Sequence, residues 1–290
     1  MAADAEHRPD DIAYLTKQVR AHDRPRYYAT LFTPASARAD LFALYGFAAE
    51  IARIPDLVSE PTLGEIRLAW WREALTSGGD DGSEGETASP ALRALNRTIS
   101  RHSLPLQPFE ALIAARSGDL YSNPPASMAD VEGRLGETES ALFQLAAIVS
   151  GSAGPDSAEA AGHAGIAYGL ARQLARFAEE RARGRAVLPA HLLAQEELTV
   201  VELFAAEPPP ALTKVISAMA RFARHHLRNA RERLAEMPPA ARLAFLPLVV
   251  VEPLLKRIDQ MDDDILSRPA GISDLETLCR IAWARLRSPG

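Results

Sequence analysis

The chain has 290 residues, of which 47% are hydrophobic and 24% are charged, and these proportions are ordinary for a folded globular protein. Its net charge of −6 and its isoelectric point near 5.7 argue against bulk electrostatic attraction to nucleic acid or anionic lipid, but they leave room for local basic patches. A single cysteine, Cys279, excludes an internal disulfide, and its apolar neighbours at helical spacing predict a buried thiol.

Apolar residues recur at helical spacing throughout the chain, and alternating strand-like segments between tight turns are absent. The sequence therefore predicts one all-α domain over residues 1–290. Residues 1–10 and the segment 77–90, which is rich in Gly, Ser and acidic residues, are expected to be flexible. The expected helices span 9–21, 36–55, 63–76, 91–102, 108–120, 137–150, 157–182, 210–237, 239–266 and 273–286.

Two of these helices carry further local signals. Gly162, Gly165 and Gly169 recur along the helix 157–182 and predict that another helix approaches it closely. Ser273 precedes the last helix and is followed three residues later by Glu276, which is the pattern of a capping box.

The sequence shows no segment that would direct or anchor the chain to a membrane. Its first residues are acidic and lack an apolar signal region. The longest apolar run, 243–255, is too short to span a bilayer and contains Pro247, Glu252 and Pro253. We therefore expect a bacterial cytoplasmic protein and leave open a peripheral contact with the inner membrane.

A first group of charged residues lies at the end of the helix 36–55. Glu50, Arg53 and Asp56 fall near one helix face, and Glu60 follows shortly after. Such acids could hold Mg²⁺ and a diphosphate, because Mg²⁺ takes one or two carboxylates together with phosphate oxygens. They could equally form surface ion pairs at a helix end, and Ala52, where a second acid would be needed, favours this alternative.

A second group follows the glycine-rich helix. Glu179 and Glu180 precede Arg181, Arg183 and Arg185, and the intervening Gly184 permits a sharp helix exit. The glutamates could bind a metal while the arginines bind a diphosphate. Pairs four residues apart on a solvated helix end explain the same pattern. The residues leave both interpretations open.

Two other charged groups predict solvated surfaces. Asp259, Asp262 and Asp263 share a helix face, but they lie close to the end of their helix, where acids mostly face solvent. A basic stripe beside His225 and His226 also predicts a solvated face, with contact to a partner or anionic lipid as the alternative. The stripe consists of Arg221, Arg224, Arg228 and Arg231. The two histidines are adjacent in sequence, so they point to different faces and form no ready metal clamp.

Three segments, in this order, resemble the squalene/phytoene synthase family. They are DRPRYYATLFTPASARADLFALYGFAAEI from Asp23, EIRLAWWREAL from Glu65, and AYGLARQLARF followed by RGRAVLP. The resemblance implies an isoprenoid-synthase-type helical bundle around a central cavity, with four lining residues: Tyr45, Phe47, Tyr168 and Gln173. It also implies, for active members, the head-to-head joining of two prenyl diphosphates on two acidic motifs that hold Mg²⁺.

Both acidic motifs of the family are incomplete in this chain. The adjacent aspartates of the first fall on Ala52 and Arg53, and only its last aspartate is retained, as Asp56. In the second, Glu180 stands in for the first aspartate, and the RGR sequence arrives about four residues early. If the chain is an enzyme, its residual metal and diphosphate positions are Asp56, Glu60, Glu179, Glu180, Arg183 and Arg185. Head-to-head synthesis is not expected from so few acids, because several Mg²⁺ ions must neutralise the leaving diphosphate.

The same combination of retained scaffold and lost acids resembles a branch of the family that acts in the assembly of respiratory complex I. The stretch VSEPTLG, 58–64, favours this branch. The resulting hypothesis is a non-catalytic protein without a cofactor, whose partner is a membrane protein complex or its assembly intermediates, with a prenyl lipid as a candidate occupant of the cavity. One alternative is an active Mg²⁺-dependent prenyltransferase that uses farnesyl or geranylgeranyl diphosphate. A second alternative is a prenyl-lipid carrier that needs no metal.

Overall fold

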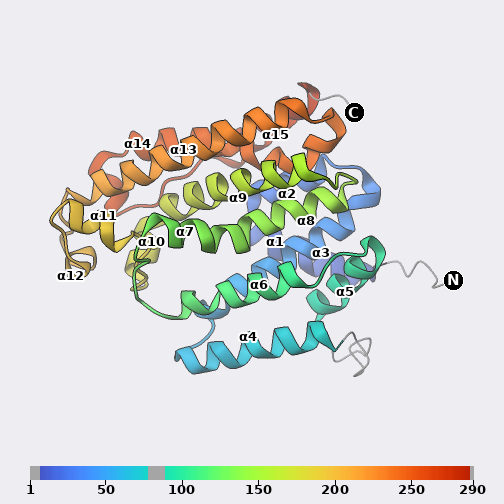
Figure 1. Ribbon diagram of the computed structural model, residues 1–290, viewed down its shortest axis with the longest axis horizontal. Helices are drawn as coiled ribbons and strands as arrows, with labels where there is room; N and C mark the ends of the chain where they lie inside the picture. The colour runs from blue at the N-terminus through green and yellow to red at the C-terminus, as the bar shows by residue number, and fades with distance from the viewer. Residues whose placement is uncertain (1–6, 78–88, 288–290) are drawn as a thin grey trace.

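The computed structural model describes residues 7–77 and 89–287, and every regular element in this part of the chain is helical. Figure 1 shows the helices as a bundle, with α13 and α14 along one edge, α9 in the middle and α4 along the opposite edge. The elements, with short 3₁₀ or π helices written η, are α1 Pro9–His22, α2 Arg24–Leu31, α3 Ala35–Ala52, η1 Ile54–Asp56, α4 Pro61–Thr76, α5 Pro90–His102, α6 Gln107–Ala115, η2 Ser117–Leu120, α7 Met128–Leu135, η3 Gly136–Ser140, α8 Ala141–Val149, α9 Pro155–Ala175, α10 Phe177–Ala182, α11 Ala190–Gln195, α12 Val200–Leu203, α13 Leu212–Glu236, η4 Pro239–Val250, α14 Val251–Asp259, η5 Asp262–Leu266 and α15 Asp274–Arg287.

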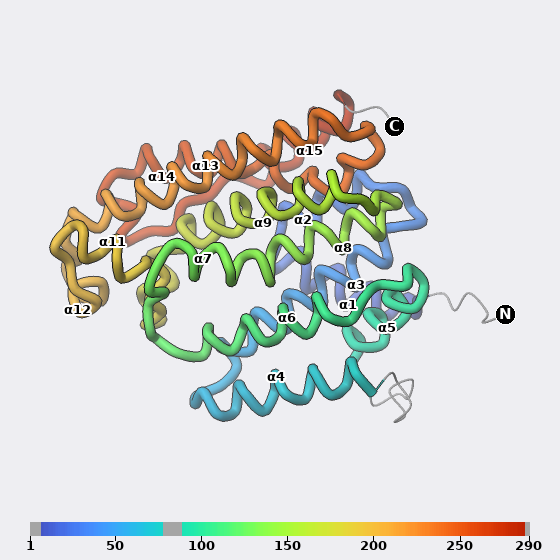
Figure 2. The backbone as a smooth tube through the Cα atoms, in the orientation of Figure 1, coloured from blue at the N-terminus to red at the C-terminus, as the bar shows by residue number. Residues whose placement is uncertain are grey.

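The core forms around two helices that are apolar on nearly every side. α3 packs against α1, α5 and α8, and α9 packs against α13, α8 and α14. Helices that are apolar all round are buried, and most residues of α3 from Asp40 to Ile51 are buried. One continuous apolar cluster joins the two helices. α8 packs against both helices and connects them, as the tube in Figure 2 traces, although α3 and α9 lie more than a hundred residues apart in the sequence.

Two of the three glycines on α9 confirm the predicted close approach of another helix. A Cβ added at Gly165 would lie 2.1 Å from the backbone N of Ser140, and one added at Gly169 would lie 2.5 Å from Leu135. η3 and the end of α7 therefore press directly on the backbone of α9. Gly162 is different, because a Cβ added there would meet nothing within 4 Å.

Several predicted elements differ from the structure. The helix expected over 157–182 is interrupted at Arg176 and forms α9 and α10. The helix expected over 239–266 is a 3₁₀ segment, η4, followed by α14 and η5. Pro247 lies inside η4, and a proline inside an α-helix removes a backbone hydrogen bond and collides with the preceding turn.

The ends of the chain also correct two expectations. Cys279 is exposed and not buried, because α15 turns its Thr277 and Ile281 toward the core. Ser273 does cap α15, since its Oγ accepts a hydrogen bond from the Glu276 N–H at 3.1 Å. The segments predicted to be flexible fall mainly outside the described residues, but Pro9 already begins α1 and Pro90 begins α5. None of the helices in the described part of the chain combines the length and apolar character that a membrane crossing requires.

Candidate functional site

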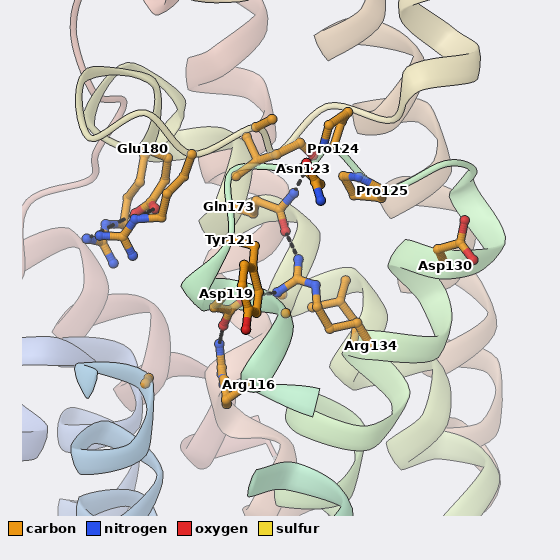
Figure 3. A pocket seen from close by; sticks show the side chains of 18 of the residues that line it. Arg116, Asp119, Tyr121, Asn123, Pro124, Pro125, Asp130, Arg134, Gln173 and Glu180 are labelled. Atoms are coloured by element: carbon orange, nitrogen blue, oxygen red, sulfur yellow. Dashed lines mark hydrogen bonds and ion pairs between the residues drawn. The ribbon is translucent and has the colours of Figure 1, made fainter. Parts of the chain in front are cut away.

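A cavity of about 360 Å³ opens where α3, η2, α7, α9 and α10 converge. Figure 3 shows its lining, in which charged and polar side chains from these segments point toward one another. Its charged lining residues are the acids Asp56, Asp119, Asp130, Glu139 and Glu180 and the arginines Arg116, Arg134, Arg172, Arg176 and Arg185. A smaller cavity of about 100 Å³ shares residues with it and reaches inward to Arg26 and Tyr45. The cavity is therefore lined by charges of both signs, whereas a prenyl chain would be bound best by an apolar tunnel.

The short helix η1, which follows α3, contributes one acid to this cavity. Asp56 lines it, together with the apolar Ala52. Glu50 instead accepts a hydrogen bond from the Tyr14 hydroxyl at 2.5 Å, and Arg53 donates to Gln18 Oε1 at 3.0 Å. Glu60 is exposed at the start of α4 and lines neither cavity. Of the two acids predicted here as residual metal positions, the structure brings only Asp56 to the site.

The second predicted group meets the first across the cavity. Gly184 adopts a left-handed φ of 74°, and this turn returns the chain so that Arg185 hydrogen-bonds to Asp56. Arg183 Nε lies 4.0 Å from the same carboxylate. The sequence prediction that these two motifs belong to one site therefore agrees with the geometry, but arginine side chains form the contact between them.

Both glutamates of α10 are also paired with arginines. Glu180 lies 3.4 Å from Arg176, 3.4 Å from Arg183 and 3.3 Å from Arg185. Glu179 lies 3.0 Å from Arg176 and 3.8 Å from Arg183. Of the two alternatives that the sequence left open for this segment, the structure shows the ion pairs at a helix end.

Deeper in the cavity lies a half-buried network, of which sequence reasoning identified only Gln173. Asp119 accepts hydrogen bonds from Arg116 at 3.0 Å and from Arg134 at 3.3 Å. Arg134 also donates to Gln173 Oε1 at 2.6 Å, and Gln173 donates to the Val187 carbonyl at 2.8 Å. Figure 3 shows this chain of contacts running through the middle of the site. Burial favours the neutral form of Asp119, but the two arginines outweigh it and lower the pKa of the carboxyl group.

Arg26 and Glu139 form the innermost ion pair. Arg26 Nη1 lies 2.8 Å from Glu139 Oε2, and both residues are buried. Burial alone would raise the pKa of Glu139, but Arg26, Arg172 and Arg116 together lower it to about 2. The carboxylate is therefore charged at neutral pH and neutralises the arginine beside it.

Three aromatic rings surround the guanidinium of Arg26. Its Cζ lies 5.1 Å from the centroid of Tyr45, 5.2 Å from that of Phe143 and 4.9 Å from that of Tyr168. Such cation–π contacts stabilise a desolvated cation, and they face an arginine whose Nε and Nη2 have no hydrogen-bond partner. Asp23 completes the group by accepting hydrogen bonds from Tyr168 at 2.5 Å and Arg172 at 2.7 Å.

The four predicted lining residues divide into two pairs. Gln173 lines the larger cavity and Tyr45 the smaller one. Phe47 instead packs edge-on against Trp71 and Phe109, and Tyr168 is fully buried beside Arg26. Neither Phe47 nor Tyr168 contributes to the lining, because aromatic and arginine side chains fill the space beside them.

The residues of this site do not fit a magnesium centre. Mg²⁺ requires oxygen ligands at about 2.0–2.1 Å in octahedral geometry, whereas Asp56, Glu179 and Glu180 each contact an arginine. Across residues 7–77 and 89–287, no group of three or more His, Cys, Asp or Glu side chains is placed to hold a metal ion. The exposed Asp259 illustrates the same pairing outside the cavity, since Arg224 Nη2 lies 2.6 Å from it.

The profile of the family described as squalene/phytoene synthase matches residues 19–276. The chain belongs to the squalene/phytoene synthase family. Among solved structures, squalene synthase HpnC from Alicyclobacillus acidocaldarius superposes with a TM-score of 0.73 at 22% identity, over 87% of this chain and 94% of that chain. The predicted all-α, isoprenoid-synthase-type fold is thereby confirmed.

Curated relatives within the squalene/phytoene synthase family carry two kinds of name. A rat protein named NADH dehydrogenase (ubiquinone) complex I, assembly factor 6, is 28% identical over 257 residues, which are 89% of this chain and 76% of the relative. A 15-cis-phytoene synthase from Synechococcus elongatus is 24% identical over 278 residues, which are 90% of this chain and 88% of the relative. The predicted resemblance to both branches of the family is confirmed.

Proposed function

We propose that this chain acts in the assembly of the respiratory NADH dehydrogenase, complex I, and does not join prenyl diphosphates. One observation carries the proposal: the acids that remain in the two family motifs meet across the cavity through Arg183 and Arg185. Ionisation of a diphosphate needs the positive charge of metal ions, which acidic side chains hold in place. Here arginines of the chain already pair with those acidic side chains.

The comparisons support the assembly role. The relatives named as complex I assembly factor 6 include the rat protein and a Drosophila melanogaster homologue that aligns over 92% of this chain. A partner in this role would be a membrane protein complex or one of its assembly intermediates. A prenyl lipid could enter the cavity only by displacing charged side chains, so the proposal does not require one.

A complementation experiment tests the assembly role. In a strain that lacks this chain, we expect membranes to lose NADH:quinone oxidoreductase activity and the fully assembled complex on native gels. Asp56→Ala and Glu180→Ala variants should restore both to the wild-type level, because the proposed role does not use these carboxylates in catalysis. A strain that assembles the complex normally without the chain would contradict the proposal.

An enzymatic assay tests the alternative of an active prenyltransferase. Purified protein, shown to be helical by circular dichroism, is given farnesyl or geranylgeranyl diphosphate with Mg²⁺, and pyrophosphate and extractable product are measured. We expect no signal above heat-inactivated protein, with a phytoene synthase as positive control. Product formation that Asp56→Ala abolishes would establish the enzyme and contradict the proposal.

A further inference from the structure

The last helix, α15, carries an apolar stripe on the face that points away from the bundle. Leu275, Trp283 and Leu286 are exposed by 71%, 58% and 75%, and Cys279 is exposed between them. These four residues, here called the α15 stripe, follow one another at spacings of four, four and three and so share one side of the helix. The opposite side of α15, with Ile281, packs against α2 and η4. α15 therefore has two apolar faces, of which the bundle covers one.

The stripe is unusual in being continuous. Exposed apolar residues scattered singly over a surface need no explanation, but a row that extends over three turns of one helix marks an interaction site. It also includes a tryptophan, whose amphipathic ring suits the boundary between apolar and aqueous surroundings.

Basic residues flank the stripe on its carboxyl-terminal half. Residues 280–287 contain Arg280, Arg285 and Arg287 and no acidic residue. Arg287 stacks on Trp283, with its Cζ 4.4 Å from the ring centroid. The helix therefore presents an apolar row bordered by arginines, within a chain whose net charge is −6.

The acids of α15 are already engaged within the chain. Asp274 accepts a hydrogen bond from Arg24 at 3.1 Å, and Glu276 lies 2.8 Å from Arg280. A second copy of the chain would thus meet the arginines of the stripe with similar arginines and with acids that already have partners. Residues 281–287 contain two arginines and no acidic residue, so an anionic surface complements this part of the helix better than a second copy of the same helix does.

We propose that the α15 stripe binds the surface of an anionic lipid bilayer, with the helix lying in the plane of the interface. An apolar face bordered by arginines, with a tryptophan at the boundary, is the pattern of interfacial helices. The arginines would contact lipid phosphates while their aliphatic stems remain along the apolar face. The proposal does not depend on the proposed function, because vesicle binding is measured without complex I.

Another helix provides a matched control. α4 also exposes a row of apolar side chains, Leu63, Ile66 and Trp70, by 47%, 60% and 47%. It differs in the placement of its acids, because Glu65 and Glu73 lie on either side of Arg67 and Arg72, whereas the acids of α15 all precede Cys279. If exposed apolar area alone caused binding, both rows would bind lipid. If the arginines matter, only α15 should bind.

Flotation with vesicles tests the proposal on the full chain. The probes are vesicles of phosphatidylcholine alone and vesicles in which phosphatidylglycerol replaces about one third of it. We expect the wild-type chain to float with the anionic vesicles, and to be released as salt rises from about 0.1 M to about 0.5 M. A Trp283→Ser/Leu286→Ser variant should lower the bound fraction at least about tenfold. An Ile66→Ser/Trp70→Ser variant should bind like the wild type.

Two further measurements complete the test. An Arg285→Gln/Arg287→Gln variant should bind anionic vesicles no better than neutral ones, and circular dichroism checks that each variant is folded. Cys279 is the single cysteine of the chain, so a polarity-sensitive fluorophore attached there should shift to the blue when anionic vesicles are added.

Three results would overturn the proposal. They are a wild-type chain that stays with neither vesicle, a Trp283→Ser/Leu286→Ser variant that binds as well as the wild type, and a control variant on α4 that loses binding equally. Size-exclusion chromatography tests whether a second copy of the chain occupies the stripe instead. A dimer that dissociates when the α15 residues are substituted, in a chain that does not bind vesicles, would assign the stripe to that second copy.

Discussion

Arg26 lies at the inner end of the cavity, with two carboxylates, Glu139 at 2.8 Å and Asp23 at 3.4 Å, and three aromatic rings as its neighbours. A buried charge is tolerated when it is paired, but removing one partner leaves the other uncompensated. Glu139 is the residue on which this balance depends most, since it lies 2.8 Å from Arg26 and 3.7 Å from Arg116.

We predict that Glu139→Gln lowers the free energy of unfolding by about 3 kcal/mol, because it removes the nearest counter-charge of the buried Arg26 and leaves it only the more distant Asp23. Urea denaturation followed by circular dichroism measures the change. Glu179→Gln is the matched control, since Glu179 is more exposed and also contacts two arginines. It should cost less than about 1 kcal/mol. Equal effects of the two substitutions would show that burial of the pair contributes nothing.

The same carboxylate predicts a pH dependence. The pKa of Glu139 is lowered from 4.5 to about 2 in the folded chain, so the unfolded chain takes up this proton first as the pH falls. Its contribution to stability is complete above pH 4.5 and is lost as the pH falls toward 2. We therefore predict that the difference in unfolding free energy between wild type and Glu139→Gln is constant from pH 7 to 5 and shrinks below 4.5. A difference that grows on acidification would contradict the assigned direction.

The sequence reveals the acids of this site more readily than their partners. Asp56 and Glu180 stand out because they belong to recognisable charged segments. Arg185 also belongs to such a segment, but its pairing with Asp56, 129 residues away along the chain, does not show in the sequence. Arg26 lies in the family-like segment that begins at Asp23, but neither it nor Glu139 stood out as a site residue. Such pairs form only when distant elements are packed together, so local sequence reasoning could not identify them.

At the scale of the elements, the glycine at position 165 determines how closely η3 approaches α9. We predict that Gly165→Ala destabilises the fold by at least about 2 kcal/mol, because its Cβ would lie 2.1 Å from the Ser140 backbone N. Gly162→Ala, three residues earlier on the same helix, should stabilise it by about 0.5 kcal/mol, since open space surrounds that position. Urea denaturation of both variants measures the two effects, and the prediction is wrong if both substitutions act in the same direction.

Helix starts were predictable where apolar periodicity coincides with a proline in the first turn, as in α1 and α5. α2 was missed because it is short and continues almost directly from α1, with Pro25 near its start. α7 was missed although Ser127 and Asp130 form a capping box at its beginning. Prolines within an apolar run, as in η4, keep the helical periodicity but change the backbone, so spacing alone could not reveal the break.

At the scale of the whole molecule, the arginine-filled cavity predicts indifference to magnesium. A ligand present at a hundred times its Kd would stabilise a folded protein by about 2.7 kcal/mol, which corresponds to a Tm shift of several degrees. We predict that Mg²⁺ with pyrophosphate changes the Tm of this chain by less than about 1 °C, as measured by differential scanning fluorimetry. A phytoene synthase relative serves as the positive control, and a shift of several degrees in this chain would restore the metal-site interpretation.

The aromatic surroundings of Arg26 and its pairing with Glu139 also bear on how such a site can change over evolutionary time. Replacing Arg26 alone leaves the buried Glu139 with only Arg116, 3.7 Å away, and replacing Glu139 alone leaves the buried Arg26 with only Asp23, 3.4 Å away. Either step would cost about 3–5 kcal/mol, a large part of the 5–15 kcal/mol that keeps a typical protein folded. We therefore expect a change between this site and a metal-binding one to proceed by paired substitutions. Single substitutions in either direction are opposed by the loss of stability.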